Sequence, residues 1–98
     1  MIRDDIISEL RKREDRLKAM GATSLYVFGS RARGDNRPDS DLDLFMDYDP
    51  ENVKSYLDFV GFELDLQDQF GIEVHLAGRN DIHPAAKQNA ERDAIRVF

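Results

Sequence analysis

Two aspartates separated by one residue, Asp41 and Asp43, lie in the alternating stretch Asp-Leu-Asp-Leu-Phe. This alternation predicts a half-buried strand, on which residues two apart face the same way. Both carboxylates would then point to one surface, where they could converge on a divalent cation such as Mg²⁺. We therefore interpret this stretch as a strand that carries metal ligands.

A glycine and a serine, Gly29 and Ser30, follow the short apolar run from Leu25 to Phe28. Glycine lets a backbone come close to a phosphate, and the N–H groups of a turn together with a serine hydroxyl can donate hydrogen bonds to it. A loop-like segment from Arg33 to Ser40 then leads to the aspartates. The order predicts a phosphate-binding turn and a pair of metal ligands at adjacent strand ends.

Such a site suits phosphoryl or nucleotidyl transfer, in which catalysis consists mostly of positioning and charge neutralisation. A third carboxylate on a neighbouring strand usually helps to hold a second ion, and Glu73 has the right phase for this role. Arg31 or Arg33 could neutralise the leaving pyrophosphate. His75 shares the face of Glu73; we interpret it as a partly exposed packing residue, with an approach to the metal site as the alternative.

The pair Gly29-Ser30, the Arg-Ala-Arg-Gly that follows it and the run from Ser40 to Leu44 together resemble the signature of the DNA polymerase β-like nucleotidyltransferase superfamily. The small size and the Gly-Ser-Arg-Ala-Arg-Gly form more narrowly resemble the minimal nucleotidyltransferases (MNT). Those proteins are typically the antitoxin half of HEPN/MNT toxin–antitoxin pairs. The specific motif covers residues 29–44, whereas length and element order match over nearly the whole chain.

The resemblance implies an α+β fold in which a small mixed β-sheet has helices packed on one face. It also implies Mg²⁺ and ATP as cofactors and transfer of AMP to a hydroxyl, thought to be a tyrosine of a HEPN ribonuclease toxin that the modification silences. For catalysis and metal binding the site residues are Asp41, Asp43 and Glu73, the last at a position where the family usually has Asp. For nucleotide binding they are Gly29, Ser30, Arg31, Arg33 and Ser40.

Two other functions stay open. Because Glu is longer than Asp by a methylene, a chain with Glu73 at the third position could be inactive and neutralise a toxin by binding alone. The third possibility is adenylylation of a small molecule of the aminoglycoside type. Enzymes of that kind normally carry an additional helical domain.

The bulk composition narrows the class of protein further. The 98 residues predict one domain over positions 1–98, and the net charge of -6 argues against a nonspecific grip on nucleic acid. The sequence has no cysteine, which excludes disulfides and thiolate chemistry. No apolar run approaches the roughly 18 residues that a membrane span needs, so we expect a cytoplasmic protein.

The elements that would position these residues follow from apolar spacing and from turn residues. We expect helices over Ile2 to Met20, from the Asp49-Pro50-Glu51 start to Phe70, and over His83 to Arg96, and strands over Ser24 to Phe28, Asp41 to Met46 and Ile72 to Ala77. In the middle helix we expect a buried stripe and an irregularity at Gly61. The stripe comprises Val53, Tyr56, Leu57, Val60, Leu64 and Phe70. His83 is interpreted as a helix-start residue.

Overall fold

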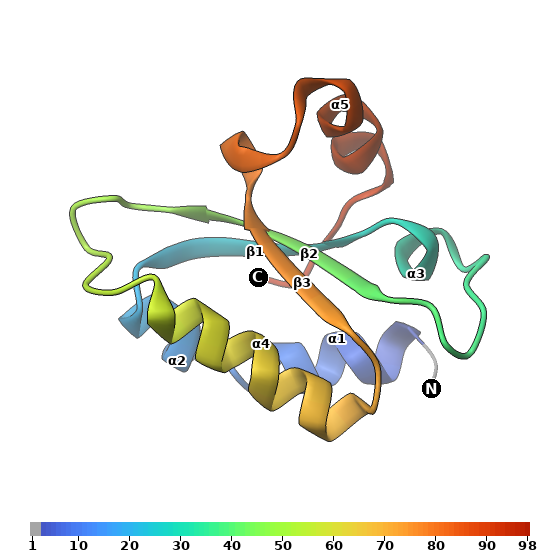
Figure 1. Cartoon of the computed structure of the whole chain (residues 1–98), viewed down its shortest axis with the longest axis horizontal. Coiled ribbons are helices and arrows are strands. Elements are labelled where there is room, and N and C mark those ends of the chain that lie inside the picture. The colour runs from blue at the N-terminus through green and yellow to red at the C-terminus, as the bar shows by residue number, and fades with distance from the viewer. Residues whose placement is uncertain (1–2) are drawn as a thin grey trace.

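The computed structural model describes residues 3–98 (Figure 1). Its elements are α1 (Arg3–Arg11), α2 (Glu14–Ala19), β1 (Ala22–Phe28), α3 (Ser30–Arg33), β2 (Leu42–Tyr48), α4 (Leu57–Phe70), β3 (Val74–Gly78), the 3₁₀ helix η1 (Arg79–Asp81), α5 (Pro84–Asp93) and β4 (Ile95–Arg96). Ile2, where the first helix was expected to begin, lies outside the described residues.

The sheet has four strands in the order β3-β2-β1-β4. β1 pairs antiparallel with both β2 and β4, whereas β2 pairs parallel with β3. Because α4 connects β2 to β3, it supplies the crossover that a parallel pair requires. The predicted small mixed sheet is confirmed, and the chemistry-bearing residues lie where β1 ends and where β2 and β3 begin.

Helices α1, α2 and α4 cover one face of this sheet (Figure 1). The core between them consists of fully buried side chains, among them Leu10, Leu17, Leu25, Leu44 and Phe62. Burying one such side chain stabilises a fold by about 1.5–3 kcal/mol. The prediction of helices packed on one face is thereby confirmed, and this layer holds β1 and β2 in the register that places the site.

The other side of the sheet is covered differently. Phe45 of β2 is fully buried there, and its ring stacks on Tyr26 at 4.8 Å between centroids. The guanidinium of Arg79 lies 5.0 Å from the Phe45 ring and makes two hydrogen bonds to the carboxylate of Asp47, at 2.8 and 2.9 Å. Figure 1 shows α5 on this side, away from α4.

The predicted length of the first helix is wrong, because the helix is interrupted at Lys12 and Arg13, between α1 and α2. The side chain of Arg13 donates a hydrogen bond to the carbonyl of Glu9, the acceptor that its own N–H would use in a continuous helix. The Arg13 N–H instead bonds to the Leu10 carbonyl at 3.0 Å. Gly21 follows the end of α2 with a φ of +112°, which residues with a side chain rarely adopt.

The expected helix start at Asp49-Pro50-Glu51 is also wrong, since α4 begins at Leu57. The Asp49 carboxylate accepts a hydrogen bond from the Glu51 N–H at 3.0 Å, but this bond closes one isolated turn. An aspartate makes the same contact in such a turn and at a helix N-cap, so the sequence alone does not separate the two. Val53, which follows the turn, packs against the core beside Gly21.

The inward face of α4 differs from the expected one. α4 buries Phe59, Phe62 and Leu66, whereas four of the residues predicted to face inward are exposed. Those four are Tyr56, Leu57, Val60 and Leu64. Helix α4 is apolar on two faces, and the face with the two phenylalanines is the one that fills the core. No break occurs at Gly61, where an added Cβ would meet nothing within 4 Å.

The last helix begins where predicted and ends earlier. The Nδ1 atom of His83 accepts a hydrogen bond from the Ala85 N–H at 3.1 Å, which confirms His83 as the helix-start residue. α5 stops at Asp93, since Ile95 and Arg96 pair with β1 instead. No helix within residues 3–98 has both the length and the apolar character of a membrane span.

Candidate active site

The two predicted metal-binding aspartates lie at the start of β2. Asp43 pairs with Phe28, the last residue of β1, while Asp41 directly precedes β2 and is more exposed. The strand boundary leaves one carboxylate half-buried against the end of β1 and the other in solvent. The structure therefore brings Asp43 next to the Gly29-Ser30 turn, as the order of motifs predicts.

Gly29 makes that approach possible. Its φ of +74° and ψ of -155° belong to a region that residues with a side chain rarely adopt. A Cβ at this position would lie 2.8 Å from Oδ2 of Asp43. Glycine is thus required both by the backbone conformation and by the neighbouring carboxylate.

Ser30 opens the single-turn helix α3 immediately after Gly29. The carbonyl of Gly29 accepts hydrogen bonds from the N–H groups of Ala32 and Arg33, each at 3.1 Å. The N–H groups of Ser30 itself and of Arg31 are among those that the start of a helix leaves without an internal partner. Donors of this kind suit a phosphate, which is the role predicted for the turn.

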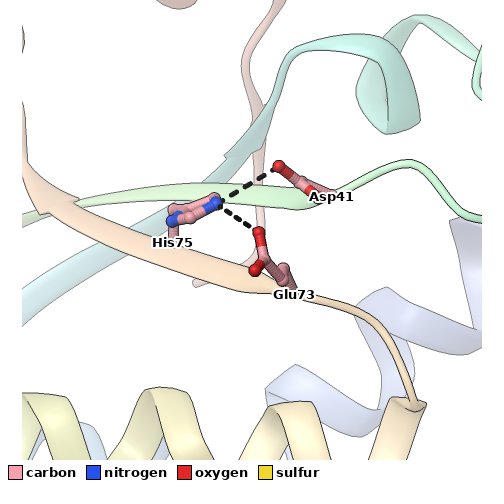
Figure 2. Close-up of side chains that lie close together, drawn as sticks. All are labelled: Asp41, Glu73 and His75. Atoms are coloured by element: carbon pink, nitrogen blue, oxygen red, sulfur yellow. Dashed lines mark hydrogen bonds and ion pairs between the residues drawn. The ribbon is translucent and has the colours of Figure 1, made fainter.

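A cluster of Asp41, Glu73 and His75 forms the exposed part of the site (Figure 2). The Nε2 atom of His75 lies 3.2 Å from Oδ2 of Asp41 and 3.5 Å from Oε2 of Glu73. One ligand atom from each residue lies within 4.8 Å of those of the other two, so the three side chains could hold a metal ion. Glu73 thus reaches the neighbourhood of Asp41, as predicted.

His75 is the site residue that sequence reasoning undervalued. The parallel register aligns it with Asp43, and the Leu42 N–H bonds to the Glu73 carbonyl at 2.8 Å, which places Glu73 before the paired part of β3. His75 therefore has the cross-strand position beside Asp43, whereas Glu73, the predicted third carboxylate, lies just before the paired residues. Its phase along the strand was visible in the sequence, but the pairing register was not.

Burial raises the pKa of Asp43, and the nearby charge of Asp41 raises it further, while His75 lowers it. The direction is the one expected of a carboxyl that is removed from water beside a second carboxyl. A cation bound between the two carboxylates would relieve this cost. The site therefore favours the binding of a positive charge beside these carboxylates.

Arg31 and Ser40, both predicted to bind nucleotide, hold the loop between α3 and β2. Arg31 is 3% exposed, and its Nε and Nη2 atoms donate to the Ser40 carbonyl at 3.0 and 2.9 Å. Nη2 also donates to the Pro38 carbonyl at 3.2 Å. The Ser40 hydroxyl accepts a hydrogen bond from the Arg37 N–H at 2.8 Å. In this structure both residues hold the loop that leads to Asp41, and the Arg31 guanidinium is turned to these carbonyls rather than to solvent.

Arg33 lies on the outer side of α3. Its guanidinium pairs with Asp35 at 3.0 Å and with Asp93 of α5 at 2.9 Å, and these hydrogen bonds raise its pKa. A cavity of about 190 Å³ lies between Gly29, Phe28 and α5, with Arg33 in its wall. Of the two arginines predicted to bind nucleotide, Arg33 lines a cavity next to the turn, whereas Arg31 is buried.

The fold and this site define a class. The profile described as nucleotidyltransferase domain matches residues 6–97, and the chain belongs to that family. The predicted class of enzyme is confirmed by this membership, together with relatives that are named adenylyltransferases.

Two relatives within this family are named as protein adenylyltransferases. A candidate protein adenylyltransferase of Methanocaldococcus jannaschii is 36% identical over 90 residues, which cover 90% of each chain. The protein adenylyltransferase MntA of Thermococcus cleftensis is 30% identical over 89 residues, 91% of this chain and 82% of that one.

Solved structures agree with this assignment. One of a candidate minimal nucleotidyltransferase covers 97% of this chain and 95% of its own, with a TM-score of 0.77 and 28% identity. A second, a toxin–antitoxin crystal structure with AMP-PNP, covers all of this chain and 73% of its own, with a TM-score of 0.71. At 16% identity this second likeness shows the fold alone.

Proposed function

We propose that this chain transfers AMP from ATP to a hydroxyl of a partner protein, a tyrosine of a HEPN ribonuclease toxin, and so acts as the antitoxin of that toxin. The observation that carries the proposal is the meeting of Asp43 with the side-chain-free backbone of Gly29, with Asp41 alongside at the same end of β2. This places a carboxylate pair beside a turn that is able to receive phosphate.

Relatives support the nature of the acceptor. The Thermococcus protein is named as a protein adenylyltransferase, and the toxin–antitoxin structure of the same fold was solved with AMP-PNP, an ATP analogue. By analogy with these two proteins, we infer that the acceptor is a protein and that this protein is a toxin. The HEPN identity of the partner comes from the resemblance of the Gly-Ser-Arg-Ala-Arg-Gly motif.

The donor set fits a divalent cation. Asp41 and Glu73 offer the carboxylate oxygens that Mg²⁺ prefers, and His75 adds a nitrogen close to both. Asp43 lies outside this cluster, beside Gly29, and its carboxylate would complete the set on the side of the phosphate turn. A bound cation would neutralise the phosphate charge and polarise the phosphorus that is attacked. The nucleotide would lie with its phosphates at Gly29 and Ser30, where the backbone leaves room for them.

The transfer itself needs little covalent chemistry from the protein. The acceptor hydroxyl oxygen forms a bond to the α-phosphorus of ATP, the bond from that phosphorus to the bridging oxygen breaks, and pyrophosphate leaves with the bond electrons. Glu73 is exposed on the open side of the site; it would bind a cation through one carboxylate oxygen and receive the hydroxyl proton on the other. Asp41 and Asp43 would hold the cation whose charge draws the triphosphate to the site.

A second function, neutralisation by binding alone, is favoured by the exposed apolar face of α4. A variant with Asp41→Asn and Asp43→Asn separates the two functions, because it keeps the shape of the site and removes both charges. We expect the wild-type chain to label the toxin from α-³²P-ATP with Mg²⁺ and the variant to leave it unlabelled and active as a ribonuclease. A variant that protects cells as fully as wild type would establish masking instead.

A further inference from the structure

The solvent-facing side of α4 carries large apolar side chains that are left uncovered. Tyr56, Leu57, Val60 and Leu64 are 60%, 77%, 47% and 58% exposed, and we call these four residues the α4 stripe. At about 100° per residue they fall within an arc of about 100° around the helix. Within residues 3–98, the exposed large apolar side chains are concentrated on this one face. Concentration of this kind marks an interaction surface rather than ordinary scatter.

A groove adjoins the stripe. It has a volume of about 340 Å³ and runs between α4 and the end of β3, with Tyr56 and Val60 on one wall and Leu76 and Gly78 on the other. β3 is an edge strand of the sheet, so the groove opens outward. A groove beside an apolar stripe is the arrangement that receives an anchoring side chain of a partner.

Charge decides what kind of partner fits. α4 contains four carboxylates and no lysine or arginine, and Asp65 is paired with Arg16 at 2.6 Å. Asp58, Glu63 and Asp68 make no ion pair with any residue from 3 to 98. Glu63 and Asp68 flank the stripe, each about 20° beyond one of its edges, whereas Asp58 lies further around the helix. These flanking carboxylates, on a chain with a net charge of -6, repel a second copy of the chain and an anionic membrane. They attract a protein surface with lysine or arginine around an apolar centre.

The stripe lies away from the carboxylate site. α4 ends at Phe70 near the start of β3, so Tyr56 and Leu57 are at the end of the helix remote from Glu73 and His75 (Figure 1). A partner held there would leave the carboxylates open to a second part of its own surface. Because side chains alternate along a strand, Asp41 and Asp43 share the face of Phe45, which is opposite α4. A partner docked on the stripe would therefore reach the carboxylates around the edge strand β3.

We propose that the α4 stripe and its groove form the docking surface for the acceptor protein, which presents apolar side chains ringed by lysine or arginine. The identity of the partner rests on the proposed function, whereas the surface and its charge do not.

The test uses the intact chain and a purified HEPN toxin from the same organism as the candidate partner, with calorimetric titration as the readout. A Leu57→Glu, Leu64→Glu variant should raise Kd by at least about 100-fold, since each buried anchor contributes about tenfold or more. A Leu57→Met, Leu64→Met variant should keep wild-type affinity. Gln88→Glu, which adds a charge to the exposed face of α5, is the matched control and should also leave Kd unchanged. Equal thermal midpoints for all variants would show that the fold is intact.

The outcomes separate docking from transfer. Unchanged Kd in the glutamate variant overturns the docking surface, as does a wild-type chain that fails to bind the toxin. A wild-type dimer that the glutamate variant converts to monomer also overturns it, in favour of a second copy. Binding that requires the stripe, with no AMP transferred, supports docking and contradicts the proposed transfer. Binding and labelling by wild type, both reduced in the glutamate variant at low toxin concentration, support both.

Discussion

Gly29 and Asp43 occupy adjoining space, since a Cβ on residue 29 would lie 2.8 Å from the Asp43 Oδ2 atom. Gly29 directly follows β1 and Asp43 lies in β2, and the two meet because Phe28 and Asp43 are partners in the ladder. The phosphate turn and the metal ligand are therefore one structural unit. A change at either residue affects the other.

Gly29→Ala should lose transfer activity and stability together. The added methyl displaces the Asp43 carboxylate, and the conformation at φ +74°, ψ -155° costs a non-glycine residue about 1–3 kcal/mol. Gly34→Ala is the matched control, because Gly34 also has a positive φ but its Cβ would meet nothing within 4 Å. Urea unfolding and a transfer assay on both variants check this. Equal activity in the two alanine variants would show that the contact with Asp43 is unimportant.

His75 should set which cation the site prefers. Imidazole nitrogen suits Mn²⁺ better than Mg²⁺, and His75 adds it to the carboxylates of Asp41 and Glu73. We expect His75→Ala to weaken Mn²⁺ binding by about tenfold or more and His75→Asp to shift the preference toward Mg²⁺. Calorimetric metal titration of the chain without nucleotide measures both. His83→Ala is the control histidine variant, since His83 only caps α5. An unaltered Mn²⁺ affinity in His75→Ala would exclude His75 from the metal site.

Arg31 should act as a positioning residue for the loop before Asp41. Arg31→Ala leaves the carbonyls of Ser40 and Pro38 without their charged donor, at a cost of about 1.5–3 kcal/mol. Because the loop leads into Asp41, transfer should fall mainly through kcat, whereas loss of a direct phosphate contact would raise KM for ATP. Steady-state kinetics at varied ATP separate the two. A raised KM for ATP with unchanged stability would show instead that Arg31 binds the nucleotide directly.

The Asp47–Arg79 pair should make stability depend on pH. Burial raises the pKa of Asp47, but hydrogen bonds from Arg79 and Ser24 outweigh it, and the net pKa lies below the ordinary value of 3.8. A carboxylate with a lowered folded-state pKa stabilises the fold above its ordinary pKa, and this stability is lost as pH falls through the folded value. Asp47→Asn should therefore destabilise the chain at pH 7 and approach wild type below about pH 4. Urea unfolding across pH checks this, and a constant difference would contradict it.

Much of the fold could be read from the sequence because short-range signals agree with the tertiary structure. The alternation at Asp41 to Met46 predicts β2, the expected helix end at Phe70 is the end of α4, and His83 caps the start of α5. The exceptions have local causes. The Arg13 side chain binds the Glu9 carbonyl, which would accept a backbone hydrogen bond if the first helix continued. Asp49 accepts the hydrogen bond of an isolated turn, and a helix N-cap makes the same bond.

The sequence identifies most residues of the site, but it does not predict the register in which β2 pairs with β3. Phase along a strand places Glu73 and His75 on one face, but only the pairing of β2 with β3 decides which of them lies beside Asp43. The buried face of α4 was ambiguous for a related reason, since apolar side chains occupy both faces and the sheet selects Phe59 and Phe62. Long-range packing decides both questions.

The central claim is transfer of AMP by the carboxylate pair, and intact-mass spectrometry of the purified toxin tests it most directly. The toxin is incubated with ATP, Mg²⁺ and either the wild-type chain or the Asp41→Asn, Asp43→Asn variant, at concentrations where both bind it. The account predicts a toxin heavier by one or more AMP groups, on a tyrosine, with wild type alone. An unmodified toxin that is nevertheless bound and silenced would contradict it.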